Sequence, residues 1–138
     1  MKALIVDDES TTRDLFALLL NGSICRQVKF ASSGNEAIEI LRRNEAFDVV
    51  LSDYHMPNGT GADLYRYIVK NSIKTAFILS SSEPFEKLTE FKDAELSGYV
   101  NKSDIKSELT KIMSSLKFVK AKTKNIVGKY VTLQIDTL

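Results

Sequence analysis

The chain has 138 residues, which is enough for one domain with a sizeable core and too few for two. Its 19 Lys and Arg residues balance 18 Asp and Glu residues to a formal net charge of +1, so charge gives no indication of nucleic acid as a partner. The one cysteine, Cys25, excludes an internal disulfide and lacks the partners of a zinc site. No apolar run is long enough for a signal peptide or a membrane span, so we expect a soluble, cytoplasmic protein with no membrane partner.

The first elements are a strand and a helix separated by carboxylates. The short apolar run 2–6 predicts a strand, which is followed at once by Asp7 and Asp8. A helix comes next, with hydroxyl residues available as its cap and an Asn-Gly pair as its stop. The expected apolar stripe of this helix consists of Leu15, Phe16, Leu18 and Leu19.

A second strand is predicted at residues 28–31, with a helix after it. Ser33 and Glu36 have the spacing of a capping box at the start of that helix. Residues 48–52 form the next buried run, and Asp53 emerges at its carboxyl end. The pattern of a strand followed by a carboxylate therefore occurs twice.

The loop after Asp53 contains a proline and two glycines and leads into a third helix. Thr60 and Asp63 predict a capping box at the start of this helix. A fourth strand is predicted at residues 75–79 and is followed by Ser80. A hydroxyl thus stands where the earlier strands end in carboxylates.

Two further helices are predicted around a fifth strand. Pro84 fits the first turn of an amphipathic helix that reaches Leu96. Residues 98–101 form a short strand that ends in Lys102, and residues 103–104 would cap the final helix. The apolar positions of the helix before this strand are Phe85, Leu88, Phe91 and Leu96.

This alternation predicts an α/β fold: a doubly wound five-stranded parallel sheet with helices on both faces. In such a sheet the carboxyl ends of all strands lie at one edge, and adjacent strands are about 5 Å apart. Polar side chains at these ends can converge if their strands are neighbours. They are Asp7, Asp8, Asp53, Ser80 and Lys102.

The chemistry of these residues points to a cation and a phosphoryl group. Crowded carboxylates repel one another, and a bound cation relieves the repulsion. Oxygen ligands favour Mg²⁺, with Mn²⁺ as an alternative, and Mg²⁺ often binds a substrate phosphate as well. Asp53 is then the natural nucleophile toward phosphorus, giving an acyl phosphate. Lys102 and Ser80 would hold further phosphoryl oxygens.

Taken together, these residues resemble the response-regulator receiver domain of two-component signalling, including its chemotaxis-regulator members. The matching features are the Asp7-Asp8 pair, Asp53 followed by x-x-Met-Pro-x-x-x-Gly, Ser80 after the fourth strand, and Tyr99-x-x-Lys102. The resemblance implies a receiver domain at residues 1–120 with the flavodoxin-like strand order 2-1-3-4-5.

The resemblance also implies roles for the site residues. Asp53 would accept a phosphoryl group from a histidine kinase or a phosphotransfer protein. Asp8, Asp53 and the main-chain carbonyl of His55 would bind Mg²⁺ directly, and Asp7 would bind it through water. The chain would then be a phosphoacceptor that assists its own phosphorylation and dephosphorylation, and not an enzyme.

Ser80 and Tyr99 would form a switch pair. In the family, the hydroxyl moves toward the phosphoryl group and the aromatic ring turns inward. This movement changes the face formed by the fourth helix, the fifth strand and the fifth helix. We therefore expect a downstream protein partner at this face. A homodimer is a separate possibility.

Two features depart from the family pattern. Ser103 follows Lys102, where the family usually has proline, and a cis bond without proline costs about 3 kcal/mol, which favours a trans bond here. Residues 121–138 form a C-terminal extension. Alternating apolar positions over residues 127–135 predict an extra strand that pairs with a sheet edge or a second subunit, and a frayed linker is the alternative.

Two other functions fit part of the pattern. A flavodoxin-like, flavin-binding protein would place a phosphate after the first strand, where Asp7 and Asp8 would repel it. A Mg²⁺-dependent phosphatase acting through an aspartyl phosphate would leave the Met-Pro loop after Asp53 unexplained.

Overall fold

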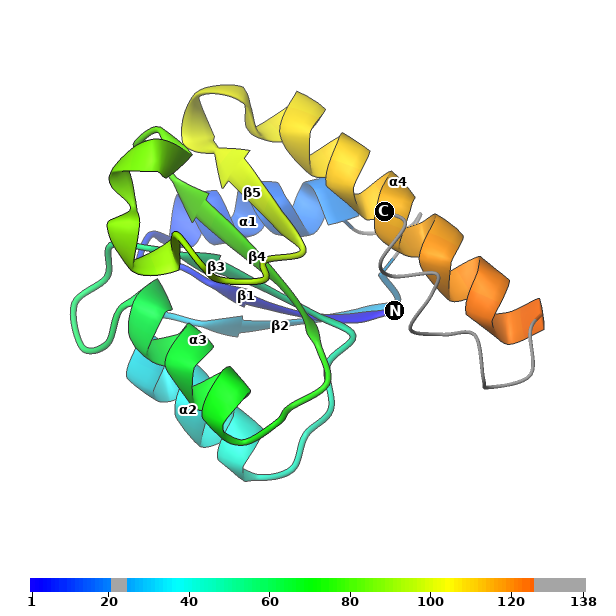
Figure 1. The fold of residues 1–138 in the computed structure, drawn as a ribbon, viewed down its shortest axis with the longest axis horizontal. Coiled ribbons are helices and arrows are strands. Elements are labelled where there is room, and N and C mark those ends of the chain that lie inside the picture. The colour runs from blue at the N-terminus through cyan, green and yellow to red at the C-terminus, as the bar shows by residue number, and fades with distance from the viewer. Residues whose placement is uncertain (21–24, 126–138) are drawn as a thin grey trace.

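The computed structural model of the chain describes residues 1–20 and 25–125, and side chains as far as Leu116. Its centre is a five-stranded parallel sheet in the order β2-β1-β3-β4-β5 (Figure 1). This confirms the predicted fold class and strand order. The strands are β1 (Lys2–Val6), β2 (Gln27–Ala31), β3 (Val49–Asp53), β4 (Ala76–Ser81) and β5 (Gly98–Asn101).

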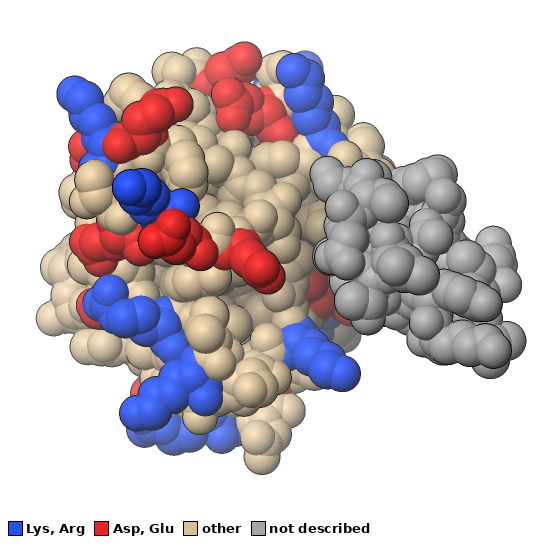
Figure 2. All heavy atoms as spheres, viewed as in Figure 1, with Lys and Arg blue, Asp and Glu red and all other residues tan. Residues whose placement is uncertain are grey.

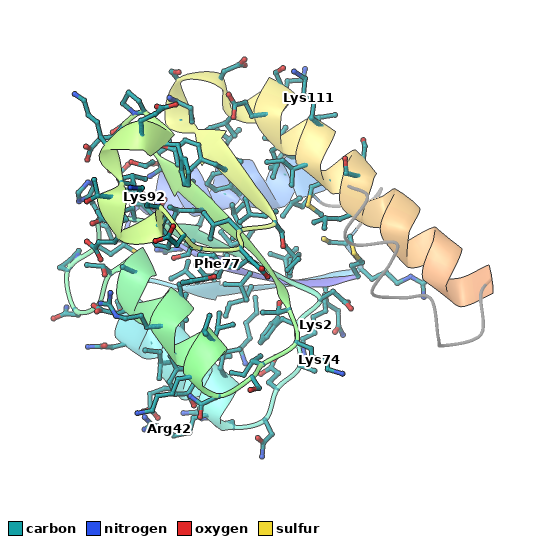
Figure 3. All side chains as sticks on the ribbon, viewed as in Figure 1. Lys2, Arg42, Lys74, Phe77, Lys92 and Lys111 are labelled. Carbon is teal, nitrogen blue, oxygen red and sulfur yellow. The ribbon has the colours of Figure 1, made fainter. Side chains whose placement is uncertain are left out.

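Helices cover both faces of the sheet (Figure 1). One core lies between the sheet and α2 (Gly34–Arg42) with α3 (Gly61–Lys70), and the other between the sheet and α1 (Ser10–Leu20) with α4 (Ile105–Asn125). In Figure 3, Phe77 of β4 lies inside the first core, whereas Lys111 projects from the outer side of α4. Within the described part of the chain, no helix has the length and apolar character needed to cross a membrane.

The prediction of a helix from Pro84 to Leu96 is wrong. The structure has two 3-10 helices there, η1 (Phe85–Lys87) and η2 (Thr89–Phe91). Leu88 separates them with φ −90° and ψ 68°, which are not helical values. The apolar residues 85, 88 and 91 repeat every three residues, and this period fits the 3.0 residues per turn of a 3-10 helix better than an α-helix.

The predicted apolar stripe of α1 is also partly wrong. Phe16 and Leu20, which are four residues apart and lie on one helix face, are buried. Leu15 and Leu18 are 41% and 74% exposed. Residues 15–20 are all apolar, so the sequence pattern alone could not identify the face that packs on the sheet.

The two predicted capping boxes agree with the structure to different degrees. Thr60 and Asp63 form the full capping box predicted for α3. The side chain of Ser33 caps α2 by accepting from the N–H of Glu36, but the Glu36 carboxylate binds Ser32 instead of the N–H of Ser33.

The start of α4 differs from the prediction. Residues 103–104 lie in a 3-10 turn, η3 (Lys102–Asp104), and it is Asn101 whose side chain accepts from the N–H of Ser103. Among the described residues there is no cis peptide bond, so the Lys102–Ser103 bond is trans. The lysine-rich residues 120–124 are helical, and the strand predicted at 127–135 lies outside the described residues.

Candidate functional site

The carboxyl ends of four strands bring the predicted site residues together at one edge of the sheet (Figure 1). Asp7 directly follows β1, and Lys102 directly follows β5. The register pairs Asp53 at the end of β3 with Ser80 in β4. Short strands that stop in register therefore place residues far apart in the sequence around one point.

The carboxylates form a compact cluster. Asp7, Asp8 and Asp53 each offer an oxygen, and these oxygens lie within 4.8 Å of one another. Asp7 and Asp53 are buried, whereas Asp8 is exposed. Three oxygen donors, two of them withdrawn from water, fit a hard divalent cation with Mg²⁺ chemistry.

Lys102 bridges two of these carboxylates. Its Nζ lies 2.9 Å from Asp7 Oδ2 and 3.2 Å from Asp53 Oδ1. Burial alone would lower the pKa of Lys102, but the bonds to Asp7 and Asp53 outweigh it and hold that pKa above its usual range. The lysine therefore stays charged beside the carboxylates.

Asp53 is a carboxylate whose burial opposes its ionisation. Burial raises the pKa of Asp53 to about 6, against the opposing effect of Lys102 and with help from the negative charge of Asp7. Its Oδ1 also accepts from the N–H of Tyr54 at 2.9 Å. A carboxylate held in a place where ionisation is unfavourable is a suitable ligand for a cation.

Ser80 has a free hydroxyl beside Asp53. The residue is fully buried, and its Oγ has no hydrogen-bond partner. It is the single buried side-chain polar atom in this condition within the described residues. A buried hydroxyl without a partner is costly, and a ligand oxygen at the site could satisfy it.

Tyr99 and His55 lie at the rim and meet at the same residue, Glu83. The Tyr99 hydroxyl donates to the main-chain carbonyl of Glu83, and its ring packs 5.1 Å from that of Phe85. The His55 ring nitrogen Nε2 lies 2.5 Å from the Glu83 carboxylate. Burial raises the pKa of the Tyr99 hydroxyl.

Sequence reasoning did not identify Glu83 or Glu90 as neighbours of the site. Glu90 accepts a short hydrogen bond from the hydroxyl of Tyr54, the residue after Asp53, and this bond raises the pKa of Tyr54 to about 12. Both glutamates belong to residues 83–95, which contain five acidic and two basic residues, and nothing in the sequence distinguishes them from the other acids there. Figure 2 shows acidic and basic side chains side by side on this face of the molecule.

Comparison with known proteins agrees with this geometry. A sequence model of the response regulator receiver domain matches residues 3–114. The chemotaxis protein CheY-3 of Vibrio cholerae is 31% identical over an alignment of 123 positions, which covers 84% of this chain and 94% of CheY-3. The response regulator protein PilR of Pseudomonas aeruginosa is 42% identical over 74 residues, which are 54% of this chain and 16% of PilR.

Solved structures of such proteins superimpose well. CheY4 of Vibrio cholerae has a TM-score of 0.74 at 27% identity, with 83% of this chain and 97% of CheY4 covered. TrrA of Thermotoga maritima, solved in complex with Mg²⁺ and BeF, has a TM-score of 0.71 at 26% identity, with the same coverage of both chains.

Proposed function

Because the chain belongs to the response regulator receiver domain family, we propose that it accepts a phosphoryl group on Asp53 in a Mg²⁺-dependent reaction. The observation that carries this proposal is the cluster of Asp7, Asp8 and Asp53 with Lys102 bonded to two of its members. The phosphoryl donor is a histidine kinase or a phosphotransfer protein. The chain acts as a phosphoacceptor and not as an enzyme with its own substrate.

In the proposed reaction Asp53 is the nucleophile. A carboxylate oxygen of Asp53 forms the new bond to phosphorus while the bond from phosphorus to the donor imidazole breaks, and the imidazole leaves with the electron pair. Asp8, Asp53 and the His55 carbonyl would hold Mg²⁺, or Mn²⁺ in its place, directly, and Asp7 would hold it through water. When bound, the cation supplies charge neutralisation for the transferring oxygens.

Two further side chains would hold the phosphoryl group. The ammonium of Lys102, already 3.2 Å from Asp53, pairs with one phosphoryl oxygen. The unpartnered hydroxyl of Ser80 donates to another, which removes the cost of its burial. Both groups interact more strongly with the phosphorylated than with the free carboxylate, and this difference can drive a conformational change.

The signal would leave through the surface around Tyr99. Movement of Ser80 toward the phosphoryl group changes the space that the ring occupies and the contact of its hydroxyl with Glu83. The receiving face consists of residues 84–96, β5 and α4. Since 3-10 turns replace the predicted helix, a downstream protein would meet an irregular acidic segment there (Figure 2).

Intact-mass measurement tests the proposal. The chain is incubated with acetyl phosphate with and without Mg²⁺, together with Asp53→Asn. One added phosphoryl group, dependent on Mg²⁺ and absent in the variant, supports the proposal. An unmodified wild-type chain in the presence of Mg²⁺ contradicts it.

A further inference from the structure

The loop at residues 54–60 is bonded to the start of α2. The N–H of Gly34 donates to the carbonyl of Gly59 at 2.9 Å, and the N–H of Asn35 donates to the carbonyl of Asn58 at 3.1 Å. Both donors belong to the first turn of α2, where N–H groups have no partner within the helix. The loop therefore satisfies two of the free donors of α2.

The rest of the loop is fixed by its neighbours in the sheet and in α3. The N–H of Tyr54 donates to the carbonyl of Ser80 at 2.9 Å, and the N–H of Gly61 donates to the carbonyl of Tyr54 at 3.0 Å. Asn58 and Gly59 have φ values of 60° and 105°, in the left-handed region, where the chain turns back. The contact with α2 thus supports Asn58 and Gly59, the part of the loop that follows several residues after the end of β3.

Gly34 makes room for this contact. A Cβ at this buried first residue of α2 would lie 2.7 Å from the carbonyl oxygens of Gly59 and Thr60. Both obstacles are main-chain atoms, so no side-chain rotation could relieve the overlap. Alanine is the better helix former, and glycine at this position therefore serves the loop and not the helix.

We propose that Gly34 is a positioning residue for the cation site. By allowing α2 to approach, it fixes the loop that carries the His55 carbonyl next to Asp53. This inference rests on the proposed function, in which that carbonyl is a cation ligand. An alanine at residue 34 would displace the loop while leaving the carboxylates on their strand ends.

The test compares Gly34→Ala with Gly98→Ala in the full chain. A Cβ at Gly98 would also lie 2.7 Å from its nearest atom, but that atom belongs to the Ile112 side chain, on the opposite face of the sheet from α2. Each variant is first melted, and Mg²⁺ is then titrated at a temperature where it is folded, with amide chemical shifts as the readout. We expect Gly34→Ala to weaken Mg²⁺ binding by about tenfold or more, as with other supports of metal ligands, and Gly98→Ala to leave it unchanged.

Unchanged Mg²⁺ affinity in Gly34→Ala, or equal weakening in both variants, would overturn the inference. A wild-type chain that binds no Mg²⁺ would instead overturn the proposed function, and the inference with it. If Gly34→Ala does not fold, amide hydrogen exchange in the wild type decides. Mg²⁺ should slow exchange at Gly34 and Asn35 more than at Asp48, whose N–H donates to the Lys2 carbonyl, and equal changes would refute the role.

Discussion

The connections that leave β3 and β4 start side by side and differ in how they are held. The one after Asp53 is anchored by main-chain hydrogen bonds to α2 and enters α3 through a complete capping box. The one after β4 forms two 3-10 turns, and its Glu90 accepts side-chain hydrogen bonds from Arg66 of α3 and from Tyr54 of the first connection.

This difference suits the two connections to different roles. Main-chain bonds inside a packed loop would hold the proposed cation site and phosphoacceptor in a constant geometry. Leu88 and Phe91 anchor the segment after β4 in the core. Its exposed side-chain contacts contribute roughly 1 kcal/mol or less each, so its exposed residues can rearrange at small cost around these two anchors. We infer that the first connection performs the chemistry and the second reports it.

The largest expected effect on phosphorylation distinguishes Asp53, at the end of β3, from Ser80 in β4. Asp53→Asn should abolish phosphorylation by acetyl phosphate, because the acceptor carboxylate is gone. Ser80→Ala should only slow it, by roughly ten- to a hundredfold, because one hydrogen bond to the phosphoryl group is lost. Intact-mass time courses measure both, and wild-type levels of modification in Asp53→Asn would contradict the assignment.

Asp8→Ala should abolish Mg²⁺-dependent phosphorylation and keep the fold. Removing one of three crowded carboxylates relieves repulsion, so the melting temperature without metal should be equal or higher. Glu9→Ala is the matched control, since it removes a neighbouring exposed carboxylate outside the cluster. A large drop in melting temperature for Asp8→Ala alone would mean that Asp8 is structural.

The pKa of Asp53, about 6, predicts a pH-dependent stability in the absence of metal. Above pH 6 the folded chain carries an unfavourably placed carboxylate, and as pH falls toward 4 protonation removes this penalty. Asp53→Asn should therefore raise the free energy of unfolding by about 2 kcal/mol at pH 8 and by little at pH 4. Urea unfolding with EDTA across this pH range measures the difference, and a gain that does not vary with pH would contradict it.

Hydrogen exchange should show which connection responds. On binding beryllofluoride with Mg²⁺, residues 84–96 and the surroundings of Tyr99 should change more than α2. Changes spread evenly over the chain, or confined to α2, would remove the distinction between the two connections.

The smallest expected effect concerns the contacts that hold the second connection. Glu90→Gln should weaken the bonds from Tyr54 and Arg66 and cost less than about 1 kcal/mol of stability. It should increase exchange within residues 85–96 more than Glu86→Gln does, because Glu86 is an exposed acid of the same segment without such bonds. Identical exchange in the two variants would show that Glu90 does not hold the segment.

The sequence was sufficient wherever local and tertiary preferences agree. Short apolar runs that stop at Asp7 and Asp53 predicted the strands, and the alternation of elements predicted one edge where their side chains meet. It was insufficient over residues 84–96, where a three-residue apolar period was taken for an α-helix. The links from Glu83 and Glu90 to the site join loops far apart in the chain, and no local pattern encodes such a contact.

The ion pair between Lys102 and Asp7 joins residues that are 95 positions apart. Closing so long a loop costs more chain entropy than closing a short one, so we expect this contact to be absent from the folding transition state. A cation or phosphoryl group bound there would then lower the unfolding rate and leave the folding rate nearly constant. The occupied domain would differ from the empty one in its lifetime against forced unfolding and irreversible thermal inactivation, as well as in shape.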